Sequence, residues 1–353
     1  MARRERAPRS RTFIYRRGTR IADTVIACDA TAGGDLLFLS NGLDPQEGES
    51  RRRSASRLGG ARAAARGQIL TTPETLALMG EAGARLRPRT LTVGYGRPFG
   101  LGTLRLELVP SGVLPGAAAL ACEDGERRIL YAGRARLGPP ALGSPPGEVR
   151  AAHALFLDAT FGHPRFRFLT REDAEDRVRR FARAARNDGR AAVVLAAPLG
   201  PAQDLAASLR ADGWKVRGHR AVVDAAAAYA RAGALAASAA PARFTGKLTR
   251  DEVLLWPAGA REAAAARRAL PEARVAWVSG LACDADACAR VAADEAIPFA
   301  NAPDFEALLA YATATGAREI AVRNGFAEDL AAAFRARGAD AYVLAPPRQI
   351  DLF

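Results

Sequence analysis

Lysine is nearly absent from this chain of 353 residues, because Lys215 and Lys247 are its only two lysines and arginine supplies the remaining side-chain positive charge. Lys and Arg together number 51 against 38 Asp and Glu, so the net charge is +13. A surface with this charge is expected to attract polyanions, including nucleic acid. A GC-rich coding bias also produces abundant Ala, Arg and Gly, so the basic character has a purely compositional alternative.

Cysteine and histidine are scarce as well, with four and three residues respectively. The cysteines are Cys28, Cys122, Cys283 and Cys288. Their scatter does not fit a disulfide framework and favours a reducing compartment. The last two frame the sequence CDADAC, whose spacing is not that of a zinc knuckle. We interpret this pair as two free thiols at the start of a helix.

Long apolar runs are missing, since no stretch approaches the roughly 20 uninterrupted residues of a membrane-spanning helix. The N-terminus, MARRERAPRSRTFIYRRGTR, is basic and lacks the apolar segment of a secretory signal. We therefore expect a soluble, cytoplasmic protein that does not associate with membranes.

The first half of the chain has the pattern of short strands separated by turns, with one helix predicted at Pro73–Gly80. The predicted strands are Thr24–Ala27, Leu36–Leu39, Gln68–Thr71, Thr90–Gly94, Gly102–Val109, Ala117–Cys122, Arg128–Ala132 and Ala154–Leu157. Successive strands with few helices predict a core of sheet packed on sheet. The length of the chain leaves room for a second lobe.

After Thr170 the pattern changes to Ala/Arg-rich helices between buried strands, which predicts an α/β insert. Thr170, with Asp173 three residues later, predicts a capped helix that runs to about Arg186. The strands predicted in this part are Ala191–Ala197, Val253–Trp256 and Arg274–Val278. The end of the chain returns to the earlier pattern, with helices at Asp304–Thr315 and Ala327–Arg337 and strands at Glu319–Val322 and Ala341–Leu344.

Three sequence blocks resemble motifs of the metallo-β-lactamase/β-CASP nucleases. They are PSGVLPGA at Pro110–Ala117, RILYAGR at Arg128–Arg134 and LDATFG at Leu157–Gly162. In order and spacing they are similar to the family's P-[SA]-G-H-x-L-G-S, L-Y-T-G-D and L-[DE]-x-T-[FY]-G segments. FGHPRF at Phe161–Phe166 and the end of the chain resemble, more narrowly, the bacterial exonucleases associated with DNA ligase, which are also labelled RNA 3′-end processing factors.

The resemblance implies an α/β fold, an αββα sandwich with an inserted α/β β-CASP domain. We expect residues 1–168 to form the first part of the sandwich, 169–297 the insert, and 298–353 the return to the sandwich and the C-terminal tail. The glycines that shape the family's loops are retained at Gly112, Gly116, Gly133, Gly162 and Gly325.

The resemblance also implies two zinc ions, which generate hydroxide and clamp the phosphodiester. The family's first ligand cluster, T-H-x-H-x-D-H, falls on SNGLDPQ at Ser40–Gln46, where the ligand positions are Asn41, Leu43, Pro45 and Gln46 and Asp44 is a neighbour. The histidine of S-G-H is Val113, and the bridging aspartate of T-G-D is Arg134. Two later histidines are lost in ANAPDF at Ala300–Phe305 and RNGF at Arg323–Phe326.

Only Asp158 remains of the acidic and histidine motif positions that can be placed. We therefore expect no metal cofactor and no catalytic residue apart from this vestigial carboxylate. The histidines His153, His163 and His219 lie outside the ligand positions, with His163 expected to be structural or solvent-facing and His219 in a loop. We expect Arg134 to pair with Asp158 where the metal would lie; the alternative is that Arg134 points to solvent.

Nucleic-acid contacts are expected from two groups of arginines. Arg51, Arg52 and Arg53 belong to a segment, Glu47–Arg66, that is either a phosphate-contacting loop or a solvated linker. Arg165 and Arg167 lie near the junction of the lobes.

The last five residues, QIDLF, resemble the Q-L-[SD]-L-F peptide that docks on the bacterial DNA sliding clamp. In that interpretation Leu352 and Phe353 fill an apolar pocket and Gln349 sets the register. The alternative is that the tail packs back onto its own domain.

Together these features favour a catalytically inactive homologue of a β-CASP exonuclease that acts as a nucleic-acid-binding or partner subunit in DNA repair or RNA processing. Its partners would include an active paralogue, a DNA ligase or a helicase. A metal-dependent exonuclease with atypical ligands and a structural interaction module are the two alternatives.

Overall fold

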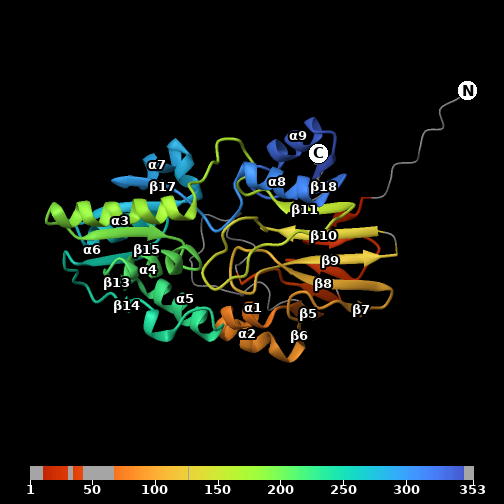
Figure 1. The fold of residues 1–353 in the computed structure, drawn as a ribbon, viewed down its shortest axis with the longest axis horizontal. Helices are drawn as coiled ribbons and strands as arrows, with labels where there is room; N and C mark the ends of the chain where they lie inside the picture. The colour runs from red at the N-terminus through yellow and green to blue at the C-terminus, as the bar shows by residue number, and fades with distance from the viewer. Residues whose placement is uncertain (1–10, 31–34, 43–66, 126, 346–353) are drawn as a thin grey trace, which may run out of the picture.

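The structure is a computed structural model that describes residues 11–30, 35–42, 67–125 and 127–345. The described residues form three β-sheets with helices on their faces (Figure 1), so the predicted α/β class is confirmed. Two of the sheets lie in the right-hand half of Figure 1 and the third lies in the left-hand half.

The first sheet has the strand order β1-β2-β3-β4-β5-β6, and two helices cover its outer face. Its elements are β1 (Phe13–Tyr15), β2 (Thr19–Ile21), β3 (Ile26–Cys28), β4 (Leu36–Phe38), β5 (Gln68–Thr71), β6 (Thr90–Thr92), α1 (Pro73–Leu78) and α2 (Gly80–Leu86). The prediction of one helix at Pro73–Gly80 is wrong at its end. Gly80 adopts φ +57°, which redirects the chain into a second helix.

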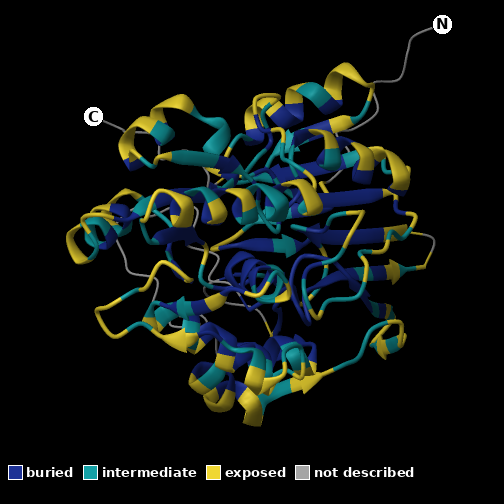
Figure 2. Cartoon of the chain, turned by 60° about the vertical axis from the view of Figure 1, so that its left-hand side comes forward, coloured by how far each residue is buried: buried dark blue, intermediate teal, exposed yellow. Residues whose placement is uncertain are grey.

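The second sheet has the order β19-β18-β11-β10-β9-β8-β7 and packs face to face on the first. Its strands are β7 (Phe99–Leu101), β8 (Leu104–Pro110), β9 (Ala118–Asp124), β10 (Arg127–Gly133), β11 (Ala154–Asp158), β18 (Glu319–Arg323) and β19 (Asp340–Val343). Phe38 and Leu70 of the first sheet share one buried cluster with Leu120 and Phe156 of the second. This cluster confirms the expected core of sheet on sheet, and Figure 2 shows the central strands as buried.

The chain leaves the second sheet after β11 and returns to it with β18, which pairs in parallel with β11. The third sheet lies between these strands in sequence and has the order β14-β13-β15-β12-β16-β17. Its elements are α3 (Arg171–Asn187), β12 (Ala192–Ala196), α4 (Pro201–Ala211), β13 (Lys215–Gly218), α5 (Arg220–Arg231), β14 (Ala242–Arg243), β15 (Glu252–Pro257), α6 (Ala260–Ala269), β16 (Arg274–Ser279), α7 (Ala285–Val291) and β17 (Glu295–Pro298).

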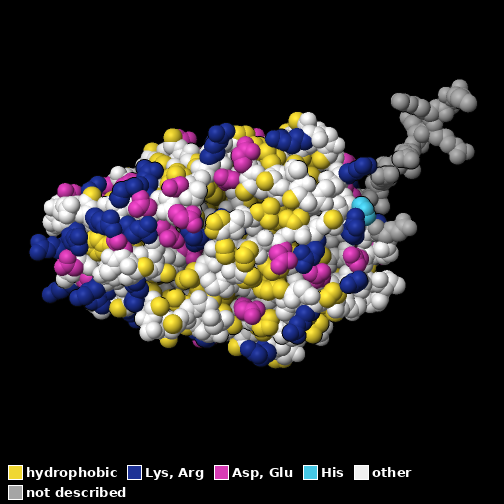
Figure 3. Space-filling view, viewed as in Figure 1, with side chains coloured by type: hydrophobic (Ala, Val, Ile, Leu, Met, Phe, Trp, Pro, Cys, Tyr) yellow, Lys and Arg dark blue, Asp and Glu magenta, His cyan; other side chains and the backbone are white. Residues whose placement is uncertain are grey.

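All pairings in the third sheet are parallel, and helices cover both of its faces. The predicted cap of α3 is confirmed, since the Thr170 hydroxyl accepts the backbone N–H of Asp173 at 3.1 Å. Basic and acidic side chains lie side by side over α3 on the face shown in Figure 3.

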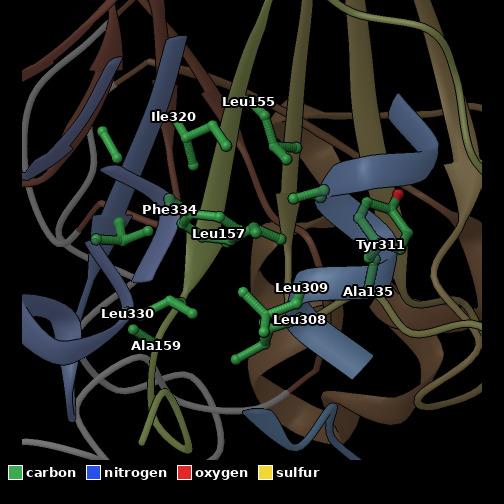
Figure 4. Packing of buried hydrophobic residues seen from close by; sticks show 14 of the residues in the cluster. Ala135, Leu155, Leu157, Ala159, Leu308, Leu309, Tyr311, Ile320, Leu330 and Phe334 are labelled. Atoms are coloured by element: carbon green, nitrogen blue, oxygen red, sulfur yellow. The ribbon is translucent and has the colours of Figure 1, made fainter. Parts of the chain in front are cut away.

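The outer face of the second sheet is covered by α8 (Phe305–Thr315) and α9 (Ala327–Ala336). Figure 4 shows Leu308 and Leu309 of α8, and Leu330 and Phe334 of α9, among the side chains packed around Leu157. The layers of this part of the molecule are therefore helix, sheet, sheet and helix. Within the described residues, no helix is both long and apolar enough to cross a membrane.

Candidate functional site

Three neighbouring strands of the second sheet, β10, β11 and β18, run parallel and end at the same edge. The register pairs Gly133 with Leu157 and Asp158 with Arg323. The residues at or just after these strand ends are Arg134, Asp158 and Asn324. Because the carboxyl ends of parallel strands are where α/β folds gather functional side chains, these three polar residues form the natural candidate site.

Asp158 is the centre of this group. Its Oδ2 accepts a hydrogen bond from Asn324 Nδ2 at 2.7 Å and lies 3.6 Å from Arg134 Nε. Its Oδ1 accepts the backbone N–H of Thr160 at 2.9 Å and also the Thr160 hydroxyl. The Asp158 side chain is 10% exposed and that of Arg134 is 23% exposed, so the predicted pairing of Arg134 with Asp158 is confirmed in a largely buried setting. We call these four residues the Asp158 cluster.

The backbone around the Asp158 cluster is closely packed. Asn324 adopts φ +70°, which presents its amide to the carboxylate, and Gly325 follows with φ +48°. A Cβ at Gly325 would lie 2.4 Å from the Thr160 Cα, so no larger residue fits there without movement of the backbone. The turn after β18 therefore packs directly against the turn after β11.

A second polar group, the Asp29 cluster, consists of Asp29, Ser40, Asn41 and Tyr131. The Asp29 carboxylate accepts the Ser40 backbone N–H at 2.9 Å, the Ser40 hydroxyl and the Tyr131 hydroxyl at 3.0 Å. Asn41 Nδ2 donates to Ser40 Oγ at 2.8 Å. Burial, and then the charge of Asp29, raise the pKa of Tyr131 well above its usual value, so the phenol keeps its proton and donates.

Asp29 and Tyr131 were not predicted to be members of the site. A lone carboxylate directly after the buried strand β3 was the available signal for Asp29. The two clusters adjoin at Gly133, where a Cβ would lie 3.7 Å from Ser40 Oγ. A carboxylate has about four acceptor positions, and each of these two carboxylates already accepts three hydrogen bonds.

Val113, at the position of the family's S-G-H histidine, is 2% exposed and belongs to an apolar cluster. The cluster includes Leu78 of α1 and Tyr229 of α5, so it joins the sandwich to the α/β unit. The loop around Val113 keeps a tight geometry, because a Cβ at Gly116 would lie 2.3 Å from the Thr75 backbone N. The loop is constrained, but its central side chain is a packing residue.

A buried polar group also joins the sandwich to the α/β unit. The Asp204 side chain of α4 is 1% exposed and lies 2.6 Å from Arg171 NH1 at the start of α3. Its carboxylate accepts Asn301 Nδ2 at 2.7 Å and the Leu142 backbone N–H at 2.8 Å. Asn301, in the ANAPDF segment, therefore takes part in the contact between the two units.

The two arginines expected near the lobe junction differ in their surroundings. Arg165 lies 3.2 Å from Asp284, and its guanidinium carbon is 4.6 Å from the centre of the Phe326 ring. Arg167 is exposed, and no ion pair is recorded for it among the described residues. The other expected binding residues, Arg51, Arg52, Arg53, Gln349, Leu352 and Phe353, lie outside the described residues, as do Leu43, Asp44, Pro45 and Gln46 of the first ligand motif.

The three histidines serve local structure. Nδ1 of His153, His163 and His219 accepts the backbone N–H of Arg128, Arg165 and Ala221, respectively. His219 lies in the loop between β13 and α5, as expected, and its side chain caps the start of α5. The four cysteines are free thiols. Over the part of the chain that the structure describes, no group of three or more His, Cys, Asp or Glu side chains could share a metal ion.

Comparison with known proteins gives one distant relationship, and no protein-family model matches the chain. A protein from Opitutus terrae (strain DSM 11246 / JCM 15787 / PB90-1), named "Probable DNA ligase", is 27% identical over 292 residues. The match covers 81% of this chain and 28% of the ligase, so the chain spans less than a third of its relative's length.

Proposed function

We propose that this chain is a DNA-binding accessory protein of the metallo-β-lactamase/β-CASP type that does not hydrolyse its nucleic acid. The observation that carries the proposal is the contact of 3.6 Å between Arg134 and Asp158. The helix–sheet–sheet–helix layers, and the α/β unit inserted between β11 and β18, support this fold type. The proposed domains are residues 1–168, 169–297 and 298–353.

The residues present do not fit the pair of zinc ions that the family implies. Arg134 places a permanent positive charge beside the remaining carboxylate, and it would repel a divalent cation there. Asn324 directs an N–H toward Asp158 and Val113 presents only hydrocarbon. Zinc needs thiolate, imidazole or carboxylate ligands, so these three positions supply none.

Two further observations support the proposal that the ligand is DNA. The chain is similar to a protein named "Probable DNA ligase", and its net charge of +13 favours a polyanionic partner. We propose a DNA ligase as its protein partner and DNA ligation or repair as its process. Docking of Gln349, Leu352 and Phe353 on a sliding clamp, and partnership with a helicase or an active paralogue in RNA processing, remain proposals from the sequence.

A combined binding and cleavage assay tests this function. The purified chain is incubated with a 3′-labelled nicked duplex and with labelled single strands, in Zn²⁺, Mn²⁺ or Mg²⁺. The expected result is a retarded DNA band with no shortened product, and faster nick sealing when the DNA ligase of the same organism is added. Cleavage that requires metal and is lost in Asp158→Asn would instead show the alternative function, a metal-dependent exonuclease.

A further inference from the structure

One edge of the sandwich is formed by a chain segment that is rich in arginine and contains no acidic residue. Between Glu81 and Glu107 the sequence contains no Asp or Glu. It contains five arginines, Arg85, Arg87, Arg89, Arg97 and Arg105. We call these five residues the basic edge. They place five positive charges within about 25 residues of a chain whose net charge is +13.

The basic edge follows the side of the sandwich where the two sheets are joined. Arg85 lies in the last turn of α2, and the short 3-10 helix η3 (Arg87–Arg89) leads into β6, the terminal strand of the first sheet. The chain then crosses to β7, the terminal strand of the second sheet (Figure 1). Val93 N donates to Thr71 O at 3.0 Å in the first sheet, and Gly96 N donates to Leu108 O at 3.0 Å in the second. The crossing is therefore tied to both sheets.

Three of the five guanidinium groups of the basic edge have no neutralising partner among the described residues. Arg85, Arg87 and Arg97 are exposed, and no ion pair or side-chain hydrogen bond is recorded for them among the described residues. Arg105 has only a contact of 3.8 Å with Glu123, both side chains being well exposed. Free guanidinium groups keep their full capacity to contact phosphate.

The arginines of α3 provide the contrast. Arg179 lies near Glu175 and Asp176, Arg180 pairs with Asp176 at 2.5 Å, and Arg183 pairs with Asp212. Their charge is locally compensated, although the helix contains six arginines in 17 residues. The basic edge therefore differs from α3 because three of its arginines have no ion pair among the described residues, and not because of its arginine content.

The apolar residues of the basic edge point to duplex DNA as the ligand. Tyr95 and Phe99 pack inward against the core between the sheets, and the Tyr95 hydroxyl donates to Ala117 O at 3.2 Å. Proteins that bind single strands usually present aromatic rings on which the bases stack. With these rings packed inward, the surface offers guanidinium groups, which suit phosphate contacts.

We propose that the basic edge binds the sugar–phosphate backbone of duplex DNA without sequence preference. This inference rests on the proposed DNA-binding function and assigns it to a surface outside the Asp158 cluster. The surface also lies apart in sequence from Arg51–Arg53, Arg165 and Arg167. Four of its arginines are solvent-exposed, and of these Arg85, Arg87 and Arg97 can be removed without loss of buried contacts or of an ion pair among the described residues.

The test compares two triple variants that remove the same charge. The edge variant carries Arg85→Ala, Arg87→Ala and Arg97→Ala, and the control carries Arg179→Ala, Arg180→Ala and Arg183→Ala. Binding to a fluorescent 30-base-pair duplex is measured by anisotropy from 50 to 300 mM salt, after thermal unfolding has shown that both variants are folded. Each lost phosphate contact should reduce the slope of log K against log salt by about 0.9.

The edge variant is expected to bind at least about 10-fold more weakly than wild type in 100 mM salt, with a slope smaller by about 2 to 3. The control is expected to change affinity by less than about 3-fold, because its arginines are already paired. Equal losses in the two variants, with wild type binding DNA, would overturn the edge assignment and leave the proposed function standing. No salt-sensitive binding by wild type would overturn both.

Discussion

Asp158 illustrates how one largely buried carboxylate is held by several neighbours. Its carboxylate accepts hydrogen bonds from Thr160 and Asn324 and lies beside Arg134. The ion pair was predicted because the sequence resemblance places both Arg134 and Asp158 at the position of the metal site. The contribution of Asn324 was not predicted, because an asparagine in the left-handed region aims its side chain in a way that no sequence pattern specifies.

Removal of the Arg134 side chain should leave Asp158 largely buried without its cation. Arg134→Ala is therefore expected to lower the free energy of unfolding by about 1 to 3 kcal/mol, since the remaining hydrogen bonds offset part of the loss. Urea unfolding measures the change. Arg180→Ala, which breaks an exposed ion pair with Asp176, is the control and should cost well below 1 kcal/mol. Equal effects of the two substitutions would contradict a structural role for Arg134.

The cysteines give a prediction with a defined pH dependence. Burial raises the pKa of Cys122 to about 11, and burial also raises the pKa of Cys28 well above its usual value. A raised pKa leaves both groups as thiols at pH 8, and the thiol form is unreactive toward alkylating agents. We expect Cys28 and Cys122 to be labelled slowly at pH 8 and completely in denaturant, and labelling of Cys122 to become faster as the pH approaches 11. Rapid native labelling at pH 8, located by peptide mapping, would be inconsistent with this core.

The helices and strands that could be predicted from the sequence are those whose signals lie close together along the chain. The cap of α3 at Thr170 and the strand β5 were predicted because their signals lie within a few residues. The three-residue strands β1 and β2 were missed, since so short a segment shows no periodicity. The Asp29 cluster was also missed, because it joins Asp29 to Tyr131 across 102 positions, which only the packing of two sheets brings about.

The loop that carries Val113 depends on glycine at a close contact. Gly116→Ala would place a Cβ 2.3 Å from the Thr75 N in a residue with φ +77°. We expect a loss of about 2 to 4 kcal/mol in the free energy of unfolding, from the steric contact and the left-handed backbone together. Gly125→Ala isolates the backbone contribution, because Gly125 has φ +58° and open space around it; that variant should lose only about 1 kcal/mol. Similar losses in both variants would show that the close contact is unimportant.

At the scale of the whole molecule, the sandwich and the α/β unit are held together by two interfaces of different chemistry. One is the apolar cluster that contains Val113 and Tyr229, and the other is the buried polar group around Asp204. Both use positions in or near motifs that would serve catalysis in the resembled family. These contacts favour a fixed arrangement of the two units.

Asp204→Asn tests the polar interface between the units. The substitution keeps the shape of the side chain but turns amide hydrogens toward Arg171 and Asn301, which are themselves donors. It is expected to cost about 2 to 4 kcal/mol and to separate the calorimetric unfolding of the protein into two transitions. A single transition at the wild-type temperature would contradict the role of Asp204 in joining the units.

The most direct test of the central claim is the metal content of the protein together with its effect on DNA. The full chain is equilibrated with excess Zn²⁺, desalted, and measured for bound zinc by mass spectrometry and for cleavage of labelled duplex DNA. If the chain binds DNA without hydrolysing it, we expect well under one zinc ion per chain. We also expect the DNA to be bound but uncut, with or without EDTA. Two zinc ions per chain, with cleavage that EDTA abolishes, would contradict the central claim.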